Sequence, residues 1–237
     1  MKRSVKLLSA LLALLVSVAF TPISAIAKTE PTVYEYVEGD GCWYYTIENG
    51  GATLTGYGGD GVSFYLPDTL GGYPLKVIGE SSCDYLDWLT EVDIPESVEE
   101  IGNCAFYMCT FLETVNMGDN VESIGESAFL SCDNLREVNF GNGVKSIGDS
   151  AFYECHSLEE IALPDSVTML GERAFDYCSK LERIYLSKSL TSIGNHTFSL
   201  CGSLREITIP DGVASIGEYA FNGCGLEQIA LPASLRN

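Results

Sequence analysis

One pair of residues recurs every 23 positions along most of the chain, and no insertion interrupts the series. The pair is an aliphatic residue followed by glycine, and it begins at Ile78, Ile101, Ile124, Ile147, Leu170, Ile193 and Ile216. Self-similarity at this period is the signature of a solenoid, because one unit cannot bury its own apolar side and must stack on its neighbours. The repeat therefore predicts an α/β solenoid of similar turns.

Each unit follows the skeleton V-x-x-I-G-x-x-A-F-x-x-C-x-x-L-x-x-I-x-L-P, as residues 144–164 illustrate. The alternating Ile and Leu near its end predict one short parallel strand, which the Pro terminates. We expect the V-x-x-I-G segment to turn a corner, with its Gly at positive φ. The A-F-x-x-C segment spaces its apolar residues as a short helix or turn would. The skeleton thus predicts a parallel sheet on one face and short helices or turns on the other.

The first 27 residues have the pattern of a signal peptide. A basic start at Lys2, Arg3 and Lys6 precedes an apolar run over residues 7–20, and Ala25-Ile26-Ala27 supplies a small-x-small cleavage site. The apolar run has about 14 residues, fewer than the roughly 20 that span a bilayer. We therefore predict export with cleavage after Ala27, and a secreted or surface-associated protein that does not insert into a membrane.

Residues 28–77 lack the repeat and contain Asn49-Gly50 between two strand-like segments, which is a strong β-hairpin signal. We expect a β-rich N-terminal cap over residues 28–77, because the open end of a solenoid must be covered. The repeats follow over residues 78–237. The first is degenerate, with Cys83 where later units have Phe, and the last is incomplete. The pattern leaves open whether the natural chain continues past Asn237.

The repeat skeleton resembles the BspA-like leucine-rich repeat of bacterial surface and secreted proteins. The resemblance covers roughly residues 33–235 and includes the cap, where a Tyr-rich hairpin leads into Gly72-Tyr73-Pro74. It implies a right-handed leucine-rich-repeat solenoid and adhesion to host proteins or other cells. This functional implication is an analogy at the level of the fold, because one solenoid can carry many binding functions.

Some positions depart from the skeleton. Leu190 replaces Val, Thr197 replaces Ala, and the Pro is absent at Met117-Gly118, Phe140-Gly141 and Leu186-Ser187. The last unit is one residue short at Cys224-Gly225-Leu226.

The formal net charge of −20 limits the partners. A nucleic-acid binder must neutralise phosphates with Lys and Arg, and this chain has 13 such residues against 33 Asp and Glu. We therefore expect no nucleic-acid partner and no binding to anionic membranes. The remaining candidate partner is an extracellular protein or a glycan.

Six of the nine cysteines occupy one column of the repeat: Cys109, Cys132, Cys155, Cys178, Cys201 and Cys224. Neighbouring turns lie about 4.8 Å apart with parallel side chains, which suits packing better than the torsion of a disulfide. We predict free, buried thiols that act as small hydrophobes, with no metal site. A disulfide between Cys42 and Cys83 is an alternative for the cap, and Cys104 falls in an exposed column.

The position after the repeat Gly is acidic or Asn in every unit: Glu80, Asn103, Glu126, Asp149, Glu172, Asn195 and Glu218. These side chains are predicted to cap the first turn of each short helix, where the helix dipole favours acceptors and negative charge. The alternative is a stripe that binds a divalent cation such as Ca²⁺, since stacked carboxylates repel each other.

No motif of a nucleophile, a zinc protease or a phosphate-binding loop occurs in the sequence. His156 and His196 fall at different repeat positions and accompany no such motif. We expect no enzymatic activity and no cofactor.

The outward positions of the predicted strands vary from unit to unit, and this strand surface is the expected binding surface. Tyr and Arg dominate binding hot spots, so Arg183 and Tyr185 are the first candidates. The full candidate set is Arg183, Tyr185, Glu160, Asn139, Asn116, Glu137 and Glu206. Adhesion to host or neighbouring-cell molecules is the predicted function. The alternative is a structural spacer or display module of a larger exported protein.

Overall fold

A computed structural model describes residues 32–38, 41–59 and 64–236. The predicted signal peptide lies outside the described residues. The chain divides into two units, residues 1–30 and residues 31–237, and the account below concerns the second.

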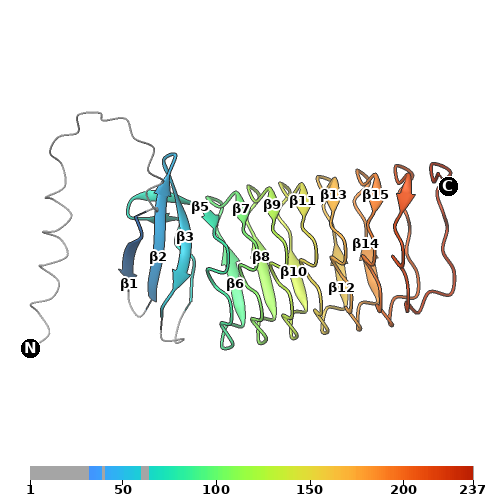
Figure 1. Cartoon of the computed structure of the whole chain (residues 1–237), viewed down its shortest axis with the longest axis horizontal. Helices are drawn as coiled ribbons and strands as arrows, with labels where there is room; N and C mark the ends of the chain where they lie inside the picture. The colour runs from blue at the N-terminus through green and yellow to red at the C-terminus, as the bar shows by residue number, and fades with distance from the viewer. Residues whose placement is uncertain (1–31, 39–40, 60–63, 237) are drawn as a thin grey trace, which may run out of the picture. The chain divides into compact units, whose positions relative to one another are not determined.

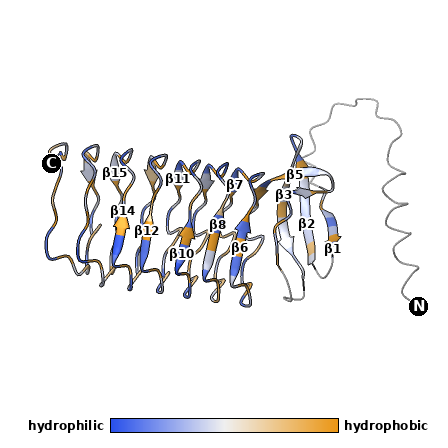
Figure 2. Cartoon of the chain, turned by 180° about the vertical axis from the view of Figure 1, so that it is seen from behind, coloured by the Kyte–Doolittle hydropathy of each residue, from blue (hydrophilic) through white to orange (hydrophobic). Residues whose placement is uncertain are grey.

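The solenoid is built of two rows of short parallel strands, one more row than the sequence predicts (Figure 1). The predicted row has the alternating L-x-x-I-x-L segments: β6 Glu91–Ile94, β8 Thr114–Met117, β10 Glu137–Asn139, β12 Glu160–Ala162 and β14 Arg183–Tyr185. We call the outward side of this row the strand face. Its residues alternate between exposed and buried, so both colours of the hydropathy scale occur in these strands in Figure 2.

The second row is formed by the segments that were predicted to be mere corners. Its members are β5 Tyr73–Ile78, β7 Glu100–Ile101, β9 Ser123–Ile124, β11 Ser146–Ile147, β13 Met169–Leu170, β15 Ser192–Ile193 and β16 Ser215–Ile216. We call this row the corner ladder. Ile147, for example, pairs in parallel with Ile124 on one side and with Leu170 on the other.

The repeat Gly does not have the positive φ that was expected, and this prediction is wrong. Its role is to let two turns approach closely. A Cβ on Gly148 would lie 2.6 Å from the carbonyl carbon of Gly125 and 2.7 Å from the nitrogen of Glu126, closer than any side chain tolerates. The backbone of one turn therefore rests directly on the backbone of the turn before it.

The A-F-x-x-C segments form turns, and the described residues contain no helix, so the helical alternative is wrong. Two residues in each turn have positive φ, such as Ser150 (54°) and Glu154 (60°), which interrupts any helical run, and only in the last turn is one of the two a glycine, Gly223. The N–H groups of Ser150, Phe152 and Glu154 donate to carbonyl oxygens of the following turn rather than within their own. We call this third side of the solenoid the turn side.

The core is a set of side-chain ladders that run through the stack. The rings of Phe106, Phe129, Phe152, Phe175, Phe198 and Phe221 stack with centroids 5.2–5.8 Å apart. Stacked aromatic pairs contribute about 0.5–1.5 kcal/mol each beyond the area they bury. Buried Ala, Leu, Val and Cys columns flank the rings.

The region before the repeats is β-rich. β1 Tyr34–Glu38, β2 Gly41–Glu48 and β3 Gly51–Tyr57 are antiparallel, and the β2–β3 hairpin turns at Asn49-Gly50, both at positive φ. β4 Thr69–Leu70 pairs with β5. β3 pairs in parallel with β5, so the cap sheet continues into the corner ladder. No helix among the described residues is long and apolar enough to cross a membrane.

Candidate functional site

The strand face places all seven candidate residues at exposed or half-exposed positions, but it does not bring them into one site. In its first half, polar side chains form a hydrogen-bonded row across the strands. Asn116 Nδ2 donates to Asp93 Oδ1 at 2.7 Å, and Asn139 Nδ2 donates to Asn116 Oδ1 at 2.9 Å and to Glu137 Oε1 at 2.9 Å. This half is polar, and its amide groups satisfy one another.

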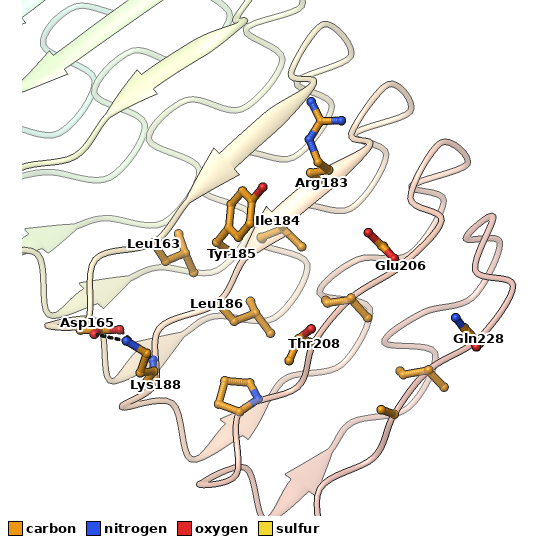
Figure 3. A pocket seen from close by; sticks show the side chains of 14 residues that line it. Leu163, Asp165, Arg183, Ile184, Tyr185, Leu186, Lys188, Glu206, Thr208 and Gln228 are labelled. Atoms are coloured by element: carbon orange, nitrogen blue, oxygen red, sulfur yellow. Dashed lines mark hydrogen bonds and ion pairs between the residues drawn. The ribbon is translucent and has the colours of Figure 1, made fainter.

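The second half contains a hollow of about 780 Å³ (Figure 3). Arg183, Tyr185 and Glu206 line it, as do apolar side chains that sequence reasoning did not select. The lining residues are Leu163, Asp165, Arg183, Ile184, Tyr185, Leu186, Lys188, Glu206, Ile207, Thr208, Pro210, Gln228, Ile229 and Ala230. An apolar floor with a few polar groups on its rim is the usual composition of a binding site.

Tyr185 is the most prominent side chain of this hollow. It follows the buried Ile184 in β14, so the alternation of the strand turns it outward, and it is 54% exposed. Its ring offers a rigid apolar surface with a hydroxyl at the tip, which is the property that makes Tyr frequent in binding hot spots.

Two ion pairs border the hollow. Arg183 Nε donates to Glu160 Oε2 at 2.6 Å on the neighbouring strand, and this hydrogen bond raises the pKa of Arg183 above its ordinary value. Lys188 Nζ donates to Asp165 Oδ2 at 3.1 Å. The backbone N–H of Lys188 also donates to Asp165, and the two bonds lower the pKa of that carboxyl. Both pairs are exposed, so their charges remain available to a partner.

Sequence reasoning missed Lys188 and Asp165 because they follow the strand rather than lie in it. The sequence did offer one signal, because Asp165 and Lys188 are 23 residues apart and therefore occupy the same position in neighbouring repeats. The same column holds Asp119 and Asn142, where Asp119 Oδ1 accepts the backbone N–H of Asn142 at 2.9 Å.

The column after the repeat Gly has a different role from the predicted helix cap. Asn103, Asp149 and Asn195 each accept, through Oδ1, the backbone N–H of the Glu that follows in the next turn, at 2.8–2.9 Å. These short acceptors alternate with the longer Glu side chains along the stack. These hydrogen bonds thus connect each of the three turns to the turn that follows it. Within the described residues, no group of three or more His, Cys, Asp or Glu is placed to hold a metal ion.

All nine cysteines are free thiols, so the alternative Cys42–Cys83 disulfide is not formed. Cys42 is half-buried and donates to Glu35 Oε1 at 3.2 Å, whereas Cys83 is buried in the core. Cys104 is half-buried rather than exposed. In the main column each thiol donates to a backbone carbonyl 26 residues earlier, as Cys155 does to Phe129 at 3.3 Å. Burial raises the pKa of Cys109 to about 12, which leaves the thiol protonated and inert.

The histidines have local contacts on the turn side. His156 Nδ1 lies 3.0 Å from the carbonyl oxygen of Tyr177, and the ring of His196 stacks on Tyr219 with centroids 5.1 Å apart.

Comparison with known proteins identifies a family. The model described as "BspA type Leucine rich repeat region" matches residues 76–201 and 122–237, with six copies. No curated protein matches the chain in sequence.

Three solved structures resemble the chain, each with a TM-score of 0.75. A leucine-rich repeat protein from Bacteroides ovatus ATCC 8483 is 32% identical over 85% of this chain and 54% of its own. A leucine rich cell surface protein from Faecalibacterium prausnitzii A2-165 is 34% identical over 86% and 55%. The Leucine Rich Repeat protein of T. pallidum is 29% identical over 82% and 88%. The chain thus spans about half the length of the first two.

Proposed function

Because the chain belongs to the BspA-type leucine-rich repeat family, we propose that it is an exported binding protein that holds an extracellular partner on its strand face. Repeats of this family are generally protein-interaction modules without enzymatic activity.

The observation that carries the proposal is the hollow around Tyr185. Most of the polar groups on the first half of the strand face hydrogen-bond to one another, so a partner gains little by replacing those contacts. The second half offers an apolar floor, an exposed Tyr and two separated, exposed ion pairs, Arg183–Glu160 and Lys188–Asp165. Binding energy concentrates where an apolar anchor enters a pocket with a polar rim.

We further propose that the protein is exported and that it adheres to molecules of a host or a neighbouring cell. The signal-peptide pattern of residues 1–27 supports export. A cell surface protein among the similar structures supports an extracellular location. An extracellular protein or a glycan on another cell would be the partner.

The experiment is an array of extracellular proteins and glycans probed with residues 28–237 and, in parallel, with the double variant Arg183→Ala/Tyr185→Ala. A partner that binds the first protein and not the second supports the proposal. Binding to no member of the array favours the alternative, a structural spacer or display module of a larger exported protein.

A further inference from the structure

One junction in the stack differs from all the others, namely the contact between the turn that begins at Leu170 and the turn that begins at Ile193. We call it the 170/193 junction. At the other junctions between described repeats, at least one strand row pairs across the contact. At the 170/193 junction the pairing is interrupted in both rows. In the described part of the chain, β13 is not paired with β15, and β14 is not paired with residues 206–209.

A backbone hydrogen bond is also missing there. In the corner ladder, the N–H of Gly102, Gly125, Gly148, Gly171 and Gly217 donates to the carbonyl oxygen 24 residues earlier, at 2.7–2.9 Å. The N–H of Gly194 makes no such bond to Leu170 within the described structure.

Two distances show that the turns are farther apart at this contact. A Cβ placed on Gly194 would lie 3.3 Å from its nearest neighbour, against 2.6 Å at Gly148. The rings of Phe175 and Phe198 are 5.8 Å apart, against 5.2–5.3 Å for the three pairs before them. A hollow of about 430 Å³ extends along the corner ladder over this junction and the turns before it, and it is lined by Ile124 and by residues 146–149, 168–171 and 191–192. The strand-face hollow lies across the same junction.

We attribute the wider spacing of the two turns to the side chains at this contact. Thr197 is fully buried in a column where the units before and after it have Ala. Its hydroxyl donates to Gly194 O at 2.9 Å and lies 3.5 Å from Gly171 O, so the larger side chain stands between these two backbones. Of the five buried polar or charged residues in the described chain, four lie in the two turns that meet here: Asp176, Ser187, Thr197 and Ser199.

The turn side, in contrast, remains closed. The N–H groups of Arg173, Phe175 and Tyr177 donate across the junction to Asn195, Thr197 and Ser199 at 2.9–3.0 Å, as their equivalents do elsewhere. The junction therefore has backbone hydrogen bonds along the turn side and no strand pairing along the other two sides, where Asn195 Nδ2 donates to Glu172 Oε1 at 2.9 Å next to the corner ladder.

We propose that the 170/193 junction is a hinge: the turns from residue 193 onward swing about the backbone bonds of the turn side, which changes the width of the strand-face hollow. The hollow has Arg183 and Tyr185 on one side of the junction and Glu206 and Thr208 on the other, so any such motion alters their separation. In a solenoid each turn contacts only its neighbours, and one weak contact is enough to uncouple the two parts.

Amide hydrogen exchange of the secreted chain, residues 28–237, followed residue by residue by NMR, tests the hinge. We expect the amide of Gly194 to exchange at least tenfold faster than those of Gly171 and Gly217. The amides of Phe175 and Tyr177, which bond across the same junction on the turn side, should be as slow as that of Phe152. Fraying from the chain end would instead give protection that falls steadily toward residue 236 on all sides of the stack.

Three variants assign the cause. Thr197→Ala restores the residue of the neighbouring units and should slow exchange at Gly194 at least tenfold. Thr197→Val keeps the size without the hydroxyl and should leave exchange fast, because the wedge is steric. Thr208→Ala, on the strand face, is the matched control and should change Gly194 less than threefold. A Gly194 amide as protected as that of Gly171 in the wild type, or unchanged exchange in Thr197→Ala, would overturn the hinge.

Discussion

The thiol of Cys155 donates a hydrogen bond to the carbonyl oxygen of Phe129, 3.3 Å away in the preceding turn. The same relationship recurs from Cys109 to Cys224, at 2.9–3.3 Å. Each thiol thus fills a small apolar space and also donates to a buried carbonyl, which a methyl group could not do; the carbonyl of Phe129, for example, accepts the N–H of Cys132 as well. Packing and hydrogen bonding together account for the cysteines without any disulfide.

Thiol counting tests this role of the column. In denaturant, freshly purified protein should yield nine free thiols. In the native state the six buried thiols should not react with an alkylating reagent, because burial keeps their pKa values high and their thiolates rare. These six are Cys83, Cys109, Cys132, Cys155, Cys178 and Cys201. Only Cys42, Cys104 and Cys224, which are half-buried, are expected to react. Two or fewer free thiols in denaturant would contradict the structure.

A pair of glycine substitutions tests the close approach of the turns. Gly148→Ala places a methyl group 2.6 Å from the backbone of Gly125 and should lower the free energy of unfolding by about 2 kcal/mol. Gly194→Ala meets its nearest neighbour at 3.3 Å and should cost less than about 1 kcal/mol. Urea denaturation measures both. Equal losses in the two variants would mean that the turns are evenly spaced.

The carboxyl of Asp176 gives the fold a dependence on pH. The residue is 2% exposed, and burial raises its pKa above the ordinary value of 3.8. A carboxyl with a higher pKa in the folded state binds its proton more tightly there, so it favours folding at low pH and loses that effect as pH rises through the folded pKa. Asp176→Asn should therefore melt at a higher temperature than wild type near pH 7, and the difference should vanish below about pH 3.

The control for this prediction is Asp211→Asn, which changes an exposed carboxyl. Its melting temperature should follow that of wild type at all pH values. A difference between Asp176→Asn and wild type that grows toward acid would show that the carboxylate, rather than the neutral acid, is stabilised by the fold.

The strands of the strand face were predictable because their residues alternate, as Glu160, Ile161 and Ala162 do. The corner ladder was not, because only two residues per turn pair and no alternation is visible in Ser146-Ile147. Glycine at each corner was expected to have positive φ, which is wrong; its role, close contact with the backbone 23 residues earlier, exists only in the stack.

The binding surface was predictable in part, because the alternation of the strand residues shows which side chains point outward. Arg183, Tyr185 and Glu206 were identified from outward positions, and the hollow contains them. Asn116 and Asn139 share the face but not the hollow, because they lie on β8 and β10, before the first residue that lines it. The hollow extends over the junction where the turns are farther apart, and a single-residue departure from the skeleton does not reveal that spacing.

We expect the strand face to bind its partner through the hollow around Tyr185. Two double variants remove one Tyr and one cation from the same turn: Arg183→Ala/Tyr185→Ala on the strand face and Tyr177→Ala/Lys180→Ala on the turn side. Melting temperatures of the two should stay close to that of the wild type, because the replaced side chains are exposed or half-exposed.

Affinity for the partner found on the array is the direct measurement, by titration with the wild type and each double variant. We expect the strand-face variant to bind at least about 30-fold more weakly, a loss of about 2 kcal/mol typical of a Tyr and Arg hot spot, and the turn-side variant to bind like the wild type. Unchanged affinity of the strand-face variant together with lost affinity of the turn-side variant would contradict the account.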